Sequence, residues 1–278
     1  MKINRIVGLV IAISFSACDL IEEIDYNTIY DTEKIVVNGF ISNDNGVTVI
    51  VKKTVAPNAP NNNDSIDSPW VTLICNEKEV AQLSKTKGNK YTLASDFQYE
   101  DGAIYKIKVE ASGLQTVISD GQQLVVKTLV DTAYNVHDTI NWAIFTYIEF
   151  DDNPLEKNYY TYKVEYYNAG IVESVYKYVL PLWCFTDEGF LSQDHRVVKY
   201  DQITSLNFDS AKVSLYTVPE FYYDFIQSYS DYEISNQNYY YETIYPVLTN
   251  IENGFGFFCS YEVDEYIFKN DFKKIYYE

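Results

Sequence analysis

The sequence of 278 residues contains only two histidines, His137 and His195. A metal site with three histidine ligands therefore cannot be built within one chain. Neither histidine lies in an HExxH run, and the chain has no GxSxG segment and no glycine-rich phosphate-binding loop. His137 precedes Asp138, but neighbouring residues of a strand point to opposite faces, so a catalytic pair is not expected. We expect neither a metal site nor a cofactor.

Cysteine is also scarce, with Cys18, Cys75, Cys184 and Cys259 spread along the chain. Three cysteines remain if Cys18 carries a lipid, and at most one disulfide can form among them. They lack the short paired spacings of a zinc site. We interpret them as small buried apolar side chains.

Basic residues are few: 21 Lys and Arg stand against 40 Asp and Glu, and the formal net charge is −19. No basic cluster interrupts this acidic character. A surface of this charge repels phosphate backbones, so nucleic acid is excluded as an expected partner.

Long apolar runs are absent apart from one at the amino terminus. Lys2 and Arg5 precede the apolar stretch from Ile6 to Ala17, which is shorter than the roughly 20 residues that span a bilayer. The charged start, short apolar segment and small residues at its end are typical of a secretory signal. Residues 1–17 are therefore predicted to be a signal peptide.

The residues Phe15-Ser16-Ala17-Cys18 resemble the lipobox of bacterial lipoproteins, although Phe15 replaces the usual leucine. This resemblance implies that the thiol of Cys18 takes a diacylglycerol and that Cys18 becomes the mature amino terminus. Stable anchoring to a membrane by lipid alone requires more than one acyl chain, which such a modification provides. The alternative is ordinary secretion without a lipid.

Four carboxylates follow Cys18 closely. They resemble the acidic export signal of surface-exposed lipoproteins of Bacteroidota, and the residues concerned are Asp19, Glu22, Glu23 and Asp25. The alternative is a tether that stays unfolded by charge repulsion. Residues 18–32 are interpreted as this acidic tether in either case.

Residues 33–128 have the period of β-strands. IVVNGFIS and VTVIVKK flank Asn43-Asp44-Asn45-Gly46, and the Asn-Gly pair suits a tight hairpin. Residues 105–111 alternate apolar and charged side chains without interruption. Short strands at regular spacing predict an all-β fold that begins with an immunoglobulin-like β-sandwich.

Residues 129–278 are predicted to form a second, tyrosine-rich and mainly β domain. Of the 28 tyrosines, 23 lie in this half. One helix is expected over residues 218–230, because Thr217 and Glu220 have capping-box spacing and Phe221, Phe225 and Tyr229 recur every four residues.

Two runs of tyrosine place these side chains on both faces of an extended chain. A core on one side cannot bury them all, so they are candidates for an interface or for binding a ligand such as a glycan or a peptide. They are Tyr159, Tyr160, Tyr162, Tyr239, Tyr240 and Tyr241. The alternative is that their abundance reflects the preference of tyrosine for strands.

Adjacent carboxylates such as Asp151-Asp152 and Asp187-Glu188 do not report the separation of about 5 to 9 Å across a sugar that a glycosidase needs. No catalytic residue is predicted, and the chain is not expected to be an enzyme.

Segments along nearly the whole mature chain resemble, in their order and spacing, the Bacteroidota lipoprotein family known as domain of unknown function 4249. They are EKIVVNGFIS, GNKYTL, GAIYKIKVEASG, FDDNPLEKNYYTYKV, FTDEGFLS, PEFYYDFIQSY and PVLTNIENGFGFFCSY. In the last segment Asn253 stands where the family often has glycine, and asparagine tolerates left-handed backbone geometry best among the other residues. The family residues of this segment are interpreted as fold-determining: Asn250, Ile251, Gly254, Gly256 and Phe257.

The resemblance implies an outer-membrane lipoprotein that faces the cell exterior or the periplasm and is commonly encoded beside a TonB-dependent transporter. The first hypothesis is an accessory or substrate-capture subunit of such a transporter. The second is a stand-alone surface module that binds a glycan or a peptide or acts in adhesion, and a hydrolase is a distant third. The predicted location is the outer membrane, by a lipid anchor, with the protein facing the cell exterior.

Overall fold

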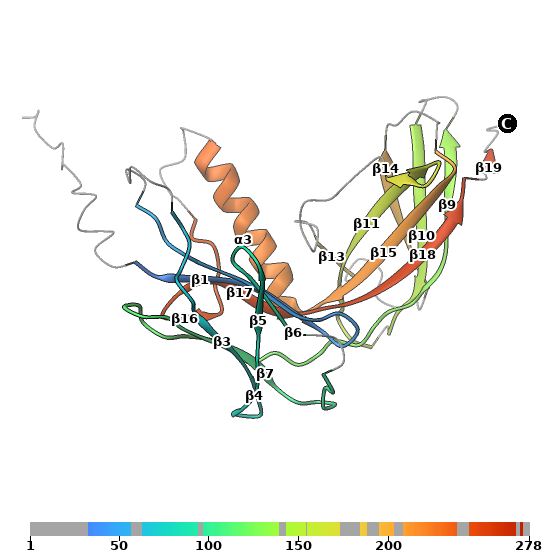
Figure 1. Ribbon diagram of the computed structural model, residues 1–278. Coiled ribbons are helices and arrows are strands. Elements are labelled where there is room, and N and C mark those ends of the chain that lie inside the picture. Colours follow the sequence, from blue (N-terminus) through green and yellow to red (C-terminus); the bar gives the residue numbers. More distant parts are fainter. Residues whose placement is uncertain are drawn as a thin grey trace, which may run out of the picture.

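The computed structural model describes residues 33–56, 63–93, 97–138, 143–153, 155–172, 184–187, 195–202, 208–237, 245–270 and 273–274. The predicted signal peptide, Cys18 and the acidic tether lie outside these residues, as do Tyr239, Tyr240 and Tyr241. The described chain is mainly β, with several sheets and one helix, α3, so the all-β prediction is confirmed. Figure 1 shows two β-lobes, with α3 beside the first.

The first lobe consists of two five-stranded sheets that enclose one core. The first sheet has the order β17-β1-β2-β6-β5, with strands Phe255–Ser260, Ile35–Ser42, Gly46–Lys53, Lys90–Leu93 and Ser84–Lys87. The second has the order β16-β8-β7-β3-β4, with strands Ile251–Glu252, Val117–Ser119, Tyr105–Glu110, Trp70–Cys75 and Lys78–Gln82.

Local sequence patterns explain these strands. Ser42 pairs with Gly46 across the β1–β2 turn, and Gly46 has a φ of 73°, so the predicted hairpin is confirmed. Val47, Val49 and Val51 are all buried on one face of β2. In β7 buried and half-buried residues alternate as the pattern predicted, because one face meets the core and the other meets solvent.

The predicted division at residue 128 needs correction at the carboxyl end. β17 pairs in parallel with β1, and β16 pairs with β8, so residues 251–260 complete both sheets of the first lobe. Alternation along a strand reports which face is buried but not which strand it pairs with. The alternation of apolar and polar residues therefore did not predict that residues 251–260 return to the first lobe.

The second lobe is a pair of sheets around a second core. One sheet has the order β14-β10-β9-β19, with strands His195–Gln202, Ala143–Asp151, Val130–Asp138 and Lys273–Lys274. The other has the order β12-β11-β15-β18, with β13 also paired to β11; its strands are Ile171–Val172, Tyr159–Asn168, Ser210–Val218, Glu262–Lys269 and Phe185–Thr186.

The helix α3, Glu220–Gln237, is longer than the predicted 218–230 and begins after Pro219. The predicted capping box does not form: the Thr217 hydroxyl accepts a hydrogen bond from the backbone N–H of Thr128, and Glu220 accepts one from the Tyr159 hydroxyl. No glycine or proline follows position 230 until Pro246, so nothing in the sequence stops the helix where it was predicted to end.

One face of α3 packs on the outer face of the first sheet. Tyr222 contacts Phe40 of β1 and Phe257 of β17, with ring centroids 5.9 Å apart in both pairs. Phe225 lies 4.6 Å from Phe257. Within the described ranges, no helix has both the length and the apolar character that crossing a membrane would require.

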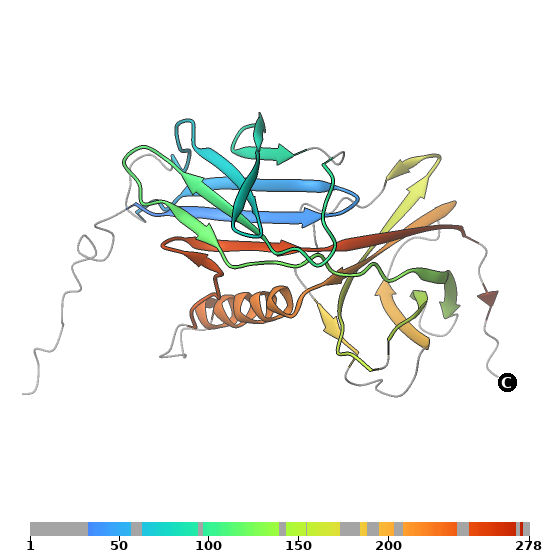
Figure 2. The same ribbon diagram turned by 90° about the horizontal axis from the view of Figure 1, so that it is seen from below.

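Three segments join the lobes: the linker between β8 and β9, the passage from β15 into α3, and the passage from β17 into β18. Figure 2 shows β17 and β18 in nearly one line through both lobes. At their junction, Glu262 accepts hydrogen bonds from the backbone N–H of Asn43 at 2.5 Å and from the Ser42 hydroxyl at 3.2 Å. This contact ties the first residue of β18 in the second lobe to the β1–β2 turn in the first.

The three tyrosines of β11 that were candidates for an interface or a ligand are buried. Tyr159, Tyr160 and Tyr162 are only 6%, 1% and 6% exposed. Tyr160 and Tyr162 belong to the core between the two sheets of the second lobe, whereas Tyr159 packs on the other face with residues of α3. Both faces of this strand are covered, so both can bury tyrosine.

Candidate functional site

A cleft of about 880 Å³ opens at the base of the second lobe, where the chain crosses from the first. Its walls come from the β8–β9 linker, the start of β9, the end of β10 with the loop after it, and the junction of β15 and α3. The charged residues that line it are Asp131, Asp151, Asp152, Glu156 and Glu220, with Lys127 and Lys157. The cleft is therefore acidic, and its charge favours cationic ligands.

Both lysines of the cleft are already engaged. Lys127 pairs with Asp44 in the β1–β2 turn, and the ammonium of Lys157 lies 5.1 Å from the centre of the Tyr159 ring. Val126 and Leu129 on the linker add apolar surface, with 85% and 61% of their area exposed. The cleft thus combines acidic walls with an apolar rim.

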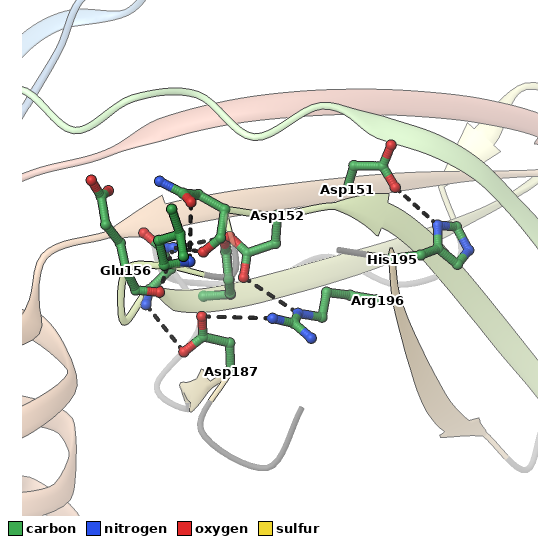
Figure 3. Close-up of polar contacts among 10 residues, drawn as sticks. Asp151, Asp152, Glu156, Asp187, His195 and Arg196 are labelled. Atoms are coloured by element: carbon green, nitrogen blue, oxygen red, sulfur yellow. Dashed lines mark hydrogen bonds and ion pairs between the residues drawn. The ribbon is translucent and has the colours of Figure 1, made fainter. Parts of the chain in front are cut away.

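Asp151 and Asp152 point in opposite directions from the end of β10, as Figure 3 shows. Asp151 is exposed and lies beside His195, whereas Asp152 points toward Arg196. Successive side chains of an extended chain face opposite sides, so these two adjacent carboxylates do not face each other.

A buried ionic group lies beneath the cleft. The Arg196 Nε donates to Asp152 at 3.3 Å, and its guanidinium lies 4.0 Å from Asp187. All three side chains are at most 3% exposed. The Tyr160 hydroxyl also donates to Asp152, and the backbone N–H of Asn158 donates to Asp187. These bonds hold β10, β11, β13 and β14 together.

The buried surroundings of Asp187 change the pKa of its carboxyl. Burial raises the pKa of its carboxyl, a hydrogen bond with Asp152 raises it further, and the charge of Arg196 opposes both effects. One arginine between two buried carboxylates leaves one negative charge uncompensated, and proton uptake relieves it. We assign this group a structural role, because its charges are turned toward one another.

His195 begins β14 and is surrounded by three carboxylates on the exposed side of the sheet. Its Nδ1 lies 3.1 Å from Asp151 and 4.0 Å from Asp131, and its Nε2 lies 3.5 Å from Glu149. The hydrogen bond with Asp151 and the charges of Glu149 and Asp151 raise the pKa of the imidazole. The ligand atoms of Asp131, Asp151 and His195 all lie within 4.8 Å of one another, which is a separation that one metal ion can bridge.

Sequence reasoning missed His195, Asp131 and Asp151 as a group. The alternation of Tyr147, Glu149 and Asp151 along β10 placed these three on one face, but nothing in the sequence indicated which strands flank β10. His137, by contrast, is set in β9 opposite Ile144, and its side chain lies outside what the structure describes.

The remaining cysteines are consistent with buried structural residues. Cys75 and Cys259 are buried, Cys184 is half-buried, and all three are free. Burial raises the pKa of Cys184 to about 12 and raises that of Cys259 as well. Thiols with a raised pKa stay protonated at neutral pH and are poor nucleophiles.

The family residues of the closing segment shape a turn. The Asn250 side chain accepts from the backbone N–H of Phe258 and donates to its carbonyl, both at 2.9 Å. Asn253 has a φ of 63°, so the prediction that asparagine adopts left-handed geometry here is confirmed. A Cβ on Gly254 would lie 2.6 Å from the carbonyl oxygen of Ile35. These contacts support the interpretation that the segment determines the fold.

Comparison with known proteins identifies the family of the chain. No curated protein matches it. The family model described as domain of unknown function (DUF4249) matches residues 21–267, which is most of the chain. The chain therefore belongs to the DUF4249 family.

Proposed function

We propose that this chain is a lipid-anchored outer-membrane protein that captures a ligand as an accessory subunit of a TonB-dependent transporter. The observation that carries the proposal is the acidic cleft at the base of the second lobe, which is lined by two of the segments that join the lobes, the β8–β9 linker and the passage from β15 into α3. The lipobox at Cys18 supports the anchor, and the acidic residues after it support exposure on the cell surface.

The position of the first strand suits this arrangement. β1 begins at Ile35, at the end of the first lobe that points away from the second (Figures 1 and 2). A segment from Cys18 to Ile35 reaches at most about 60 Å when fully extended. An anchor at Cys18 would set the first lobe nearer the membrane and leave the cleft free to meet a ligand or the mouth of a transporter.

Co-purification tests the partner. The tagged protein, extracted from membranes with a mild detergent, is expected to bring down a TonB-dependent receptor. The matched control is Cys18→Ser, which lacks the thiol that takes lipid and should leave the membrane fraction and lose the receptor. Recovery of the anchored protein alone, with the receptor demonstrably present in the extract, would contradict the proposal.

A stand-alone module that binds a glycan or a peptide is the second candidate, and the exposed side of β9 and β10 favours it. Tyr134 and Tyr147 stack there with centroids 5.4 Å apart and planes 8° apart, and the Lys199 ammonium lies 3.6 Å from the centre of the Phe145 ring. Half-buried aromatic rings offer flat faces to sugars and to peptide side chains.

An array of glycans and peptides separates the two candidates. Binding that is lost in Tyr147→Ala, together with absence of a co-purified receptor, would support the stand-alone module. Ile171→Ala, an exposed substitution on β12, is the matched control and should bind as the unmodified protein does.

A further inference from the structure

We propose that Asp131, Asp151 and His195 form a binding site for a divalent first-row transition-metal ion on the rim of the acidic cleft. The proposal does not depend on a transporter partner. It also revises the expectation from sequence that no metal is bound, because the three ligands come from residues far apart in the chain.

The geometry fits one ion. Oxygen and nitrogen ligands bind zinc at about 2.0 to 2.2 Å, so two of them lie about 3 to 4 Å apart around the same ion. The Nδ1 of His195 lies 3.1 Å from the nearer oxygen of Asp151 and 4.0 Å from that of Asp131. All three ligand atoms are within 4.8 Å of one another, so small side-chain adjustments suffice.

The backbone holds the ligands on three neighbouring strands of one sheet. Asp151 and His195 are directly opposite each other in the β10–β14 ladder, so their side chains share a face. Sheet hydrogen bonds fix both positions. A site on strands is more rigid than one on loops.

A β-bulge brings in the third ligand. Glu149 pairs with Thr132, but the next residue, Phe150, pairs with Val130, so Asp131 is the extra residue of β9. Without the bulge Asp131 would face Phe150 in the core; with it, Val130 takes that buried place and Asp131 is exposed beside Asp151. Bulges re-aim side chains in this way and are frequent beside functional sites.

Glu149 orients the imidazole. Its carboxylate lies 3.5 Å from the Nε2 of His195, and it also accepts a hydrogen bond of 2.8 Å from the Tyr134 hydroxyl. A proton on Nε2 that points at Glu149 leaves the lone pair of Nδ1 directed toward Asp131 and Asp151. Histidines that bind metals commonly place their second ring nitrogen against a carboxylate in this manner.

The ligand set indicates the class of ion. One imidazole with two carboxylates suits zinc or manganese better than calcium or magnesium, which prefer oxygen ligands throughout. Three carboxylates surround a single imidazole here, in a chain of net charge −19, so a divalent cation is attracted by the site and by the molecule.

Calorimetry tests the proposal on the purified full-length protein in detergent, after treatment with EDTA and dialysis into a buffer that does not bind metals. Titration with ZnCl₂ is expected to show one site per chain. Cobalt(II) is expected to occupy the same site and to give visible absorption that zinc abolishes. His195→Gln and Asp151→Asn should each weaken zinc binding at least tenfold, and Glu149→Gln should weaken it about 10- to 100-fold.

Glu156→Gln is the matched control, because Glu156 lines the same cleft but lies outside the ligand group. It should bind zinc as the unmodified protein does, and circular dichroism should show every variant folded. The proposal is overturned if the unmodified protein binds no zinc, or if His195→Gln binds it as tightly. Equal losses in Glu156→Gln would likewise overturn it, since they would indicate diffuse attraction by the acidic cleft.

Discussion

The role of a tyrosine side chain in this protein depends on whether other elements cover it. Tyrosine on β11 is buried on both faces, and burial elsewhere raises the pKa of Tyr216 and Tyr261 to about 12. Their hydroxyls therefore keep their protons at neutral pH. An amphipathic side chain of this kind suits a core as well as a binding surface, so its abundance alone does not indicate a ligand.

Asn250 offers a test at the same scale. Its amide satisfies both backbone groups of Phe258 in a buried turn, so Asn250→Ala should lower the free energy of unfolding by about 2 kcal/mol or more. Asn250→Asp keeps the shape but cannot donate to the Phe258 carbonyl, and should be destabilised at least as much at neutral pH. Urea unfolding measures both. Stability unchanged in Asn250→Asp would show that the side chain does not determine the turn.

Among the elements, β17 depends on a close approach to β1. Gly256 has a φ of 98°, and a Cβ there would lie 2.0 Å from the carbonyl oxygen of Val37. The side chain that glycine lacks would push apart the parallel pair that completes the first sheet. A short element can therefore depend on a single residue with no side chain.

Gly256→Ala is accordingly expected to destabilise the protein by well over about 1 kcal/mol. Gly88→Ala is the matched control: Gly88 also has a positive φ, of 57°, but a Cβ there would meet nothing within 4 Å. Gly88→Ala should introduce only backbone strain, without a steric clash. Its thermal midpoint should therefore fall less than that of Gly256→Ala. Equal falls in the two variants would mean that the approach to Val37 is unimportant.

In the whole molecule, the joint between the lobes contains Glu262. Burial raises the pKa of its carboxyl, although the hydrogen bonds from Asn43 and Ser42 act in the opposite direction. Because the folded state holds this proton more tightly than the unfolded state, the stabilisation is complete below the unfolded pKa and is lost as pH rises through the folded pKa. The affected range therefore begins near the ordinary value of 4.5 and extends upward.

Glu262→Gln removes this titration and keeps the shape. Relative to the variant, the unmodified protein should be most stable in acid and should lose that advantage as pH rises above about 4.5. Urea midpoints from pH 4 to pH 8 measure the difference, with Glu252→Gln, an exposed carboxylate of β16, as control. A difference that stays constant or grows with pH would contradict the assignment.

The sequence was sufficient for features that depend on neighbours along the chain. Alternation predicted β7, the Asn-Gly pair predicted the β1–β2 hairpin, and the order of short segments indicated the family. The lipid anchor at Cys18 and the transporter partner remain predictions. Each confirmed feature follows from the period of a strand or the backbone freedom of a few residues, which are local properties.

Features that depend on strand partners required the three-dimensional structure. The chain returns to the first lobe through β16 and β17, the two-sided cover of β11 buries its tyrosines, and the bulge in β9 sets Asp131 beside Asp151 and His195. Strand alternation specifies a face, whereas pairing joins residues that are distant along the chain, such as Asp151 with His195 and Val36 with Phe255. The candidate metal site belongs to this second class, because its three ligands meet only when β9, β10 and β14 form one sheet.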